Sequence, residues 1–264
     1  MNRDTECLHR ESNTKSLNKT LAILSTFNEK TPMQRTSDIA AKLGINISTV
    51  SRHLNTLLDW GFLQRDDLTG CYYPGIKILE LAGTALQNND IYRYAFPELQ
   101  KISYEHNVHS HMGIQEMEDI VHMISCSCES TKNLAIPMGH RQPVYCTAMG
   151  RAILAYLPPA KSQDILKKSD RRKLTEETKT EMEEINYELA VVRQKGYCLL
   201  KNELALNKAS VAAPVFDRNR MPVAAISVST TVHSLEKPER ERELARAVLN
   251  TSARISGKLG YYPN

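Results

Sequence analysis

The fold is decided by residues 36–61, which read TSDIAAKLGINISTVSRHLNTLLDWG. Apolar side chains recur in this stretch at helical spacing over two short segments, a pattern that predicts two helices. Gly44 lies between them. Because glycine adopts a positive φ without a Cβ clash, we expect it to end the first helix in a tight turn. Two helices joined in this way form a helix-turn-helix, whose second helix enters the major groove of DNA.

The polar side of the second helix carries residue types that contact DNA. Short hydroxyl and amide side chains surround one guanidinium, Arg52, and such groups bind base edges and phosphates. A purely structural helix pair would more often show Glu and Lys pairs on that side. We expect Arg52, Ser48 and Thr49 to make the main contacts in the groove. The full set of predicted DNA-contact residues is Arg35, Thr36, Ser48, Thr49, Ser51, Arg52, Asn55 and Arg65.

The flanking residues complete a winged helix-turn-helix. Residues 16–28 predict a first helix that covers the other two, and residues 61–73 predict a β-hairpin, or wing. Trp60 ends the second helix of the motif, and we expect it to pack under the wing. Six basic and three acidic residues in 14–61 give this region a net positive charge, the sign that a phosphate backbone attracts. The DNA-binding domain is therefore placed at residues 14–75, after a disordered leader at residues 1–13.

The composition of the whole chain is that of a two-domain protein without a membrane segment. It has 264 residues, 41% hydrophobic content and a formal charge of +4, which is only mildly basic. Neither a run of 18 apolar residues nor an apolar N-terminal signal segment occurs, so we expect a cytoplasmic protein. The six cysteines are scattered along the chain, and reduced thiols are the expectation in that compartment.

The remainder of the chain predicts a linking helix and an α+β domain. Residues 76–88 are amphipathic, and we place a linker helix at 76–89 and the second domain at 90–264. Pro97 is expected in the first turn of a helix at 92–107 or at a bend in it. Further helices are predicted at 147–157, 162–168, 176–194 and 238–259, and strands at 108–115, 120–126, 134–138, 196–201, 210–216 and 223–230.

Several motifs in this order resemble the IclR family of bacterial transcriptional regulators. The helix-turn-helix part of the resemblance is Ile39-Ala40-Ala41-Lys42-Leu43-Gly44-Ile45, followed by Ser48-Thr49-Val50, Arg52, Leu54 and Leu57. The second part begins with Gly139-His140-Arg141-Gln142-Pro143-Val144-Tyr145-Cys146-Thr147-Ala148-Met149-Gly150-Arg151-Ala152. It continues with Gly196-Tyr197, Val211-Ala212-Ala213-Pro214-Val215-Phe216-Asp217 and Ala224-Ala225-Ile226-Ser227-Val228-Ser229.

The resemblance implies a ligand-responsive regulator, more often a repressor than an activator. It implies a GAF-like second domain with a curved antiparallel sheet, and homodimers or dimers of dimers on palindromic operators. Dimerisation would run largely through the N-terminal helices and the linker. By the resemblance, a small-molecule effector would bind in the second domain, against residues 147–152 and the strands around Ser210, Ser227 and Ser229. No cofactor is implied.

The residues of that predicted pocket suit a small anion. Ala148, Met149 and Gly150 would lie at the start of a helix, where free N–H groups and the helix dipole favour negative charge. Ser227 and Ser229 alternate along a strand, so both hydroxyls point to one face, and Ser210 could join them. We therefore expect a small carboxylate or a sugar acid as the effector.

The pocket region also departs from the common family pattern. Asn207-Lys208-Ala209-Ser210 stands where many members carry Gly-Leu-Arg-Cys, and Leu200 lies near the position of an acidic residue in many members. These differences leave the ligand's identity open. Lys208 could pair with a carboxylate or face solvent.

Two pairs of residues in the second domain could also form a metal site. His109 and His111 alternate on one predicted strand, and Cys126 and Cys128 alternate at the end of the next, so each pair lies on one face. If the hairpin turns at residues 118–119, His111 faces Cys126 and His109 faces Cys128, a zinc-like set. A shift in register by one residue would destroy this arrangement.

Enzymatic activity and RNA binding have less support in the sequence. The chain lacks a G-x-S-x-G elbow, a phosphate-binding glycine loop and an H-E-x-x-H motif, although Cys146 and His140 lie close in sequence. With four Phe and one Trp, it offers no aromatic platform for stacking RNA bases. A DNA-binding regulator that is not an enzyme accounts best for the sequence.

Overall fold

The computed structural model describes residues 15–127 and 136–262. The chain divides into two compact units, Met1–Asn88 and Asn89–Asn264, each with its own hydrophobic core. Within the part of the chain that the model describes, no helix combines the length and the apolar character that crossing a membrane requires.

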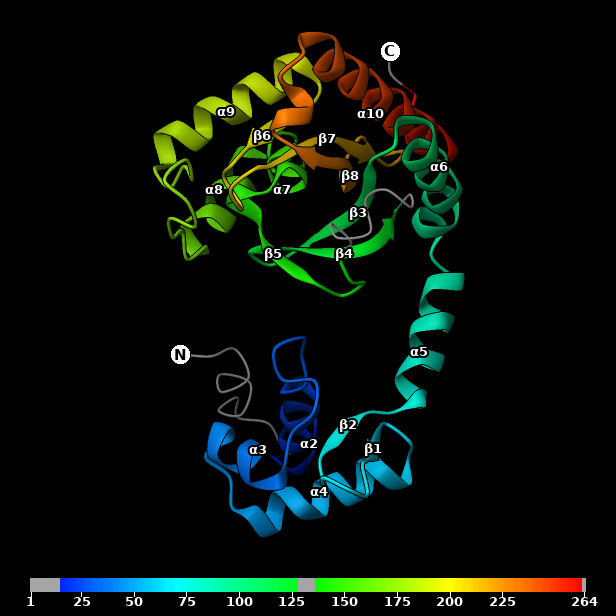
Figure 1. Ribbon diagram of the computed structural model, residues 1–264, viewed down its shortest axis with the longest axis vertical. Coiled ribbons are helices and arrows are strands. Elements are labelled where there is room, and N and C mark those ends of the chain that lie inside the picture. Colours follow the sequence, from blue (N-terminus) through cyan, green and yellow to red (C-terminus); the bar gives the residue numbers. More distant parts are fainter. Residues whose placement is uncertain (1–14, 128–135, 263–264) are drawn as a thin grey trace. The chain divides into compact units, whose positions relative to one another are not determined.

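The first unit is a winged helix-turn-helix (Figure 1). Its elements are α2 (Lys15–Ser25), α3 (Thr36–Leu43), α4 (Ile47–Asp59), β1 (Leu63–Arg65), β2 (Tyr72–Pro74) and α5 (Ile76–Gln87). The apolar faces of α2, α3 and α4 meet in a core that includes Ile23, Ile39 and Leu54, none of which is exposed to solvent. Gly44 ends α3 with φ 64°, the left-handed conformation expected from the sequence, and Asn46 caps α4 by accepting from the Ser48 N–H.

The wing is a short antiparallel hairpin in which Leu63 pairs with Pro74 and Arg65 pairs with Tyr72. Gln34 extends this hairpin, because its backbone exchanges hydrogen bonds of 3.0 and 2.8 Å with Tyr72. The expectation that Trp60 packs under the wing is wrong, since the residue is 70% exposed. Leu63 and Tyr72 fill the inner side of the wing instead, and Trp60 follows the last turn of α4 on the outside.

Six strands in the described part of the second unit form one antiparallel sheet in the order β5-β4-β3-β8-β7-β6. The strands are β3 (His109–Glu116), β4 (Asp119–Cys126), β5 (Arg141–Pro143), β6 (Cys198–Lys201), β7 (Lys208–Phe216) and β8 (Pro222–Thr231). The helices are α6 (Asp90–His106), α7 (Ala148–Leu154), α8 (Pro159–Lys168), α9 (Met182–Lys195) and α10 (Pro238–Lys258), with short 3-10 turns at Val144–Cys146 and His233–Leu235.

The two faces of the sheet are covered by different helices (Figure 1). The long helices α6 and α10 cover one face, against Met112, Val211 and Ile226. The short helix α7 covers the other face, where Ile120 and Ala212 belong to a second core that α8 and α9 complete. The residues that the sequence predicted to bind an effector lie on this α7 side of the sheet.

Two details of the second unit differ from the sequence expectations, and one alternative is decided. Pro97 lies in the interior of α6, which excludes the first-turn alternative. Of the strand expected at 134–138, residues 134–135 lie outside the described residues and 136–138 are not in a strand. An unexpected strand, β5, follows this segment and pairs with β4 through Ile120 and Gln142. A strand of three residues is too short to show a period of two in the sequence.

Candidate DNA-contact helix and effector pocket

Helix α4 buries one side and presents the predicted DNA-contact residues on the other. Val50, His53, Leu54 and Leu57 are buried against the rest of the unit. The predicted DNA-contact residues on the other side are wholly or partly open to solvent. Ser48, Arg52 and Asn55 are exposed, and Thr49 and Ser51 are half-buried. The helical period of 3.6 residues separates the two sets, so the polar side of α4 is free of core packing.

Arg35, Thr36 and Arg65 lie on other elements of the same unit. Arg35 is exposed at the start of α3, where its backbone N–H donates to Asp38 Oδ2 at 3.2 Å, and Thr36 is half-buried. Arg65 is exposed on the wing, and its guanidinium carbon lies 5.6 Å from the centre of the Tyr72 ring. A cation–π contact of this kind holds a long side chain in one region of the surface.

His53 lies on the buried side of α4 and has a role that its place in the sequence does not reveal. Its Nδ1 lies 2.8 Å from the Thr20 hydroxyl oxygen, which ties α4 to α2. Burial, followed by the charges of Arg52 and Lys19, lowers the pKa of His53. A neutral imidazole in a hydrogen bond therefore anchors the underside of the helix.

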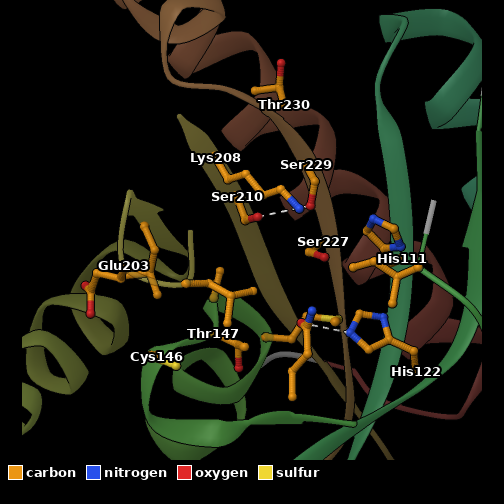
Figure 2. Close-up of a pocket in the computed structure, with 16 residues that line it drawn as sticks. His111, His122, Cys146, Thr147, Glu203, Lys208, Ser210, Ser227, Ser229 and Thr230 are labelled. Carbon is orange, nitrogen blue, oxygen red and sulfur yellow. Dashed lines mark hydrogen bonds between the residues drawn. The ribbon is translucent and has the colours of Figure 1, made fainter. Parts of the chain in front are cut away.

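A pocket opens on the α7 face of the sheet in the second unit (Figure 2). The volume open to the centres of water molecules is about 60 Å³, enough for a few waters or a compact small molecule. Strands β3 to β8 and helix α7 all contribute to its wall. The lining residues are His111, His122, Ile136, Gln142, Cys146, Thr147, Ala148, Met149, Leu200, Glu203, Leu204, Lys208, Ser210, Ser227, Ser229 and Thr230.

Five of the six predicted effector-binding residues line this pocket: Ala148, Met149, Ser210, Ser227 and Ser229. Gly150 does not. Its N–H donates to Thr147 Oγ1 at 3.2 Å, so this amide is already used within the helix cap. A Cβ at Gly150 would overlap the carbonyl oxygen of Val144, which explains why glycine is needed there.

The serines gather because of the register between neighbouring strands. Ser210 on β7 is paired directly with Ser229 on β8, and their hydroxyl oxygens lie 3.0 Å apart. Ser227 lies two residues along β8 and is paired with His111 on β3. Lys208 also lines the pocket, and Figure 2 shows its side chain extending toward the Ser210–Ser229 pair.

Two histidines, His111 and His122, form another part of the wall, and no sequence motif marks them as effector-site residues. His111 is fully buried, and neither ring nitrogen has a hydrogen-bond partner among the described residues. Burial, reinforced by His122, His109 and Lys208, lowers the pKa of His111 to about 3, so its ring is neutral at ordinary pH. The His122 ring lies 5.5 Å from that of His111, and its Nε2 is 3.0 Å from Gln142 Oε1.

A buried ion pair adjoins the pocket. The Arg151 guanidinium donates to both carboxylate oxygens of Glu203, at 2.8 and 2.6 Å, and its Nε donates to the Tyr145 carbonyl at 2.8 Å. Glu203 also accepts from the Lys179 backbone N–H at 3.1 Å. The two charges compensate one another, so the pair adds little net charge to the pocket. Glu203 was missed because a lone acid in a loop has no periodic signal.

Family models match both units of the chain. The model of the bacterial transcriptional regulator IclR C-terminal matches residues 83–257, and the model of the IclR helix-turn-helix domain matches residues 16–67. The chain belongs to the IclR family of bacterial transcriptional regulators. The predicted fold class, a winged helix-turn-helix followed by an α+β domain with an antiparallel sheet, is confirmed.

Relatives of this IclR-family protein match along most of their length. A glycerol operon regulatory protein from Streptomyces coelicolor is 32% identical over 85% of this chain and 88% of its own. The regulator KdgR from Escherichia coli is 29% identical over 94% of this chain and 93% of its own. A crystal structure of a transcriptional regulator from Rhodococcus superposes with a TM-score of 0.81, at 28% identity over 93% of this chain and 98% of that one.

Membership in the IclR family supports a DNA-binding transcriptional regulator rather than an enzyme. Cys146 is not an activated nucleophile, because burial raises the pKa of this thiol to about 12 and keeps it protonated. A protonated thiol is a poor nucleophile. Cys146, which is close to His140 in the sequence, lines the candidate effector pocket.

The register of β3 and β4 contradicts the zinc arrangement. His111 is paired with Ser125 and Ser110 with Cys126, so the pairing differs by one residue from the one that a zinc site requires. A shift of one residue turns Cys126 to the other face of the sheet, where it packs in the α6 and α10 core. Cys128 lies outside the described residues, and among those described no group of three or more His, Cys, Asp or Glu could hold a metal ion.

Proposed function

We propose that this IclR-family regulator is a repressor that binds a palindromic operator as a homodimer or a dimer of dimers, and that a small carboxylate or sugar acid in the pocket lowers its operator affinity. The observation that carries the proposal is the composition of the pocket wall, where hydroxyl donors and a lysine gather on one side. The exposed polar side of α4 supports the DNA-binding part.

The charges around the pocket favour an anionic effector. Arg151 and Glu203 neutralise one another, and the low pKa of His111 keeps that ring uncharged. Lys208 is the lining cation that has no ion-pair partner among the described residues. An ammonium group next to the hydroxyls of Ser210 and Ser229 is a suitable partner for a carboxylate, since charge-assisted hydrogen bonds are the stronger ones.

The DNA-contact proposal keeps the eight residues that the sequence singled out. Ser48, Thr49, Ser51, Arg52 and Asn55 would lie in the major groove, and Arg35, Thr36 and Arg65 would contact phosphates. Two copies related by a two-fold axis would place their α4 helices on half-sites about 34 Å apart, or a multiple of this spacing.

The apolar surface of the first unit supports a homodimer. Helix α5 has no buried residue, and its Ile76, Leu79 and Leu81 side chains are all more than half exposed. Leu17 and Leu21 on α2 are exposed to a similar extent. Apolar side chains in this number are stabilised when another protein surface covers them, and a second copy of the chain is the simplest partner.

The effector can change DNA affinity only through its different affinities for the DNA-bound and free states. Couplings of this kind are typically about 1–3 kcal/mol, or roughly 5- to 150-fold in affinity. The direction follows from the proposal: an effector that binds the DNA-free state more tightly releases the operator.

The test has two stages. Selection of duplex DNA from a random library should yield a palindromic site, whose affinity is then followed by fluorescence anisotropy. A thermal-shift screen of small carboxylates and sugar acids should identify a stabilising compound that weakens this DNA binding. A selected site without two-fold symmetry would contradict the dimer. A compound that strengthens DNA binding would contradict the release mechanism, and a screen in which only neutral or cationic compounds stabilise would contradict the anionic effector.

A further inference from the structure

The pocket wall holds a pair of unsatisfied nitrogens on His111. The side chain is fully buried, it lines the pocket, and neither Nδ1 nor Nε2 has a hydrogen-bond partner among the described residues. A buried polar group without a partner destabilises a fold by about 1–3 kcal/mol. An apolar side chain of similar size would avoid this penalty, so a ligand that hydrogen-bonds to the ring gives the histidine a reason to be there.

The pocket has two chemically different ends. Lys208 and the Ser210–Ser229 pair form a cationic, hydroxyl-rich end. His111 is paired with Ser227, which lies two residues along β8 from Ser229, so the two ends are separated by roughly 7 Å at the strand rise of about 3.3 Å per residue. Figure 2 shows His111 and His122 beside each other at this second end.

We propose that His111 selects the effector by hydrogen-bonding to a hydroxyl group, so that the pocket takes hydroxy acids in preference to plain acids and to diacids of the same length. This inference rests on the proposed carboxylate-binding function of the same pocket. It specifies a hydroxyl group at the end of the effector opposite the carboxylate.

The chemistry of a neutral imidazole distinguishes these three classes of ligand. One ring nitrogen donates and the other accepts, and a hydroxyl group can accept from the first or donate to the second. A methyl group at this end leaves the ring nitrogens unsatisfied. A second carboxylate would be a buried charge without a cation beside it, because the low pKa of His111 leaves the ring uncharged and Lys208 is engaged at the other end.

The position of His122 supports the same assignment. Its ring lies 5.5 Å from the His111 ring in an edge-on arrangement, and Gln142 Oε1 fixes it by a hydrogen bond of 3.0 Å to Nε2. The second histidine is thus held in place by the protein, whereas neither nitrogen of His111 bonds to a protein group within the described ranges. Of the two histidines, His111 is the one with no protein hydrogen bond at either ring nitrogen within the described ranges.

The test uses the full-length protein and three series of acids of about three to six carbons: ω-hydroxy acids, the matching alkanoates and the matching diacids. Isothermal titration calorimetry gives the dissociation constant of each compound. For the wild type we expect the best hydroxy acid to bind at least ~10-fold more tightly than its alkanoate and its diacid, the ratio that one buried hydrogen bond supplies. In His111→Leu the ratio of the hydroxy acid to its alkanoate should fall to about one, whereas His111→Asn should retain part of it. The diacid should stay disfavoured in both variants, because neither adds a cation at this end.

Two controls separate this inference from the proposed function. Lys208→Met should raise the dissociation constants of the hydroxy acid and the alkanoate by similar factors and leave the ratio between them unchanged. His233→Leu, at a histidine whose side chain is 83% exposed outside the pocket, should change nothing. In addition, the imidazole nitrogens of His111 in the ¹⁵N-labelled wild type should shift when the hydroxy acid binds and not when the alkanoate binds. This measurement holds even if His111→Leu folds poorly.

The outcomes have different consequences. If the acids bind, Lys208→Met weakens them and His111→Leu keeps the wild-type ratio, the role of His111 is refuted and the carboxylate pocket stands. If His111 nitrogens shift equally with alkanoate and hydroxy acid, the role of His111 is refuted as well. If no acid of any series binds the wild type, the carboxylate proposal fails and the selection of hydroxy acids fails with it.

Discussion

The two units of this protein present their functional side chains in opposite ways. Helix α4 keeps its polar residues on the surface, and only one side of the helix is packed. The pocket of the second unit collects polar residues inside the protein, where His111, Glu203 and Ser227 are buried. A surface helix needs only its own amphipathic pattern to function, whereas a pocket needs several strands in one register. The two regions should therefore respond differently to substitution.

The largest expected effect is in the second unit, where Glu203→Gln removes one partner of the buried ion pair. The Arg151 charge would remain buried without compensation, which destabilises a protein by about 3–5 kcal/mol. Urea unfolding, followed by hydrogen exchange measured on individual peptides, should show the loss of stability in residues 89–264 and not in the first unit. The double variant Arg151→Met with Glu203→Gln should recover most of it. A single variant as stable as the wild type would mean that the pair contributes nothing to the fold.

On the surface of the first unit, Arg52→Ala should weaken operator binding by about 1–3 kcal/mol without changing stability, because an exposed arginine contacts DNA and not the core. Arg242→Ala is the matched control, since this arginine is 72% exposed on α10 and pairs with Glu239. Fluorescence anisotropy at physiological salt measures both variants. Equal affinities for the two would remove Arg52 from the interface, and a fall in the melting temperature of Arg52→Ala would show that the residue has a structural role.

Acid should affect the second unit through His111. Its pKa lies near 6.5 in the unfolded chain and at about 3 in the fold, so between these values the unfolded state binds more protons. Stability therefore falls as the pH is lowered below 6.5, by up to about 1.4 kcal/mol per pH unit from this group. Unfolding curves between about pH 6.5 and pH 4.5 should show this slope, and His111→Leu should reduce it. An unchanged slope in the variant would assign the acid sensitivity to other groups, of which His109 and His53 also have lowered pKa values.

The smallest expected effect is on the effector response. Ser229→Ala removes one hydroxyl of the Ser210–Ser229 pair and should weaken effector binding by about 0.5–1.5 kcal/mol, the usual contribution of one hydrogen bond. Operator binding without effector should not change, and Ser227→Ala should behave in the same way. Ser234→Ala, outside the pocket, is the control. A normal effector response in both pocket variants would contradict the assignment of these serines.

The first unit, which carries its functional residues on the surface of α4, was easier to predict than the second. The helical spacing of Ile39, Val50 and Leu54 and the position of Gly44 were enough to locate both helices and the turn. Trp60 was predicted wrongly because a large aromatic residue at the end of a helix is usually packed. Nothing in the local pattern shows that Leu63 and Tyr72 already fill the space beneath the wing.

The pocket was predicted only in part. Ser227 and Ser229 could be placed on one face because a strand alternates, and Ser210 was placed near them by the family resemblance. The sequence could not show that β3 lies next to β8, which brings His111 to Ser227 although the two residues are more than a hundred positions apart. It also could not show that Gly150 uses its amide in the cap of α7.

By itself, the sequence determined the winged helix-turn-helix, the polar side of its second helix, the family and the serine-bearing strands, because local spacing and short motifs encode these features. Tertiary structure alone decided the hairpin register that removes a zinc site, the Arg151–Glu203 pair and the position of His111 in the pocket wall. The physical reason is that strand pairing and burial depend on contacts between distant segments. A shift of one residue in such a pairing moves a side chain to the opposite face of the sheet.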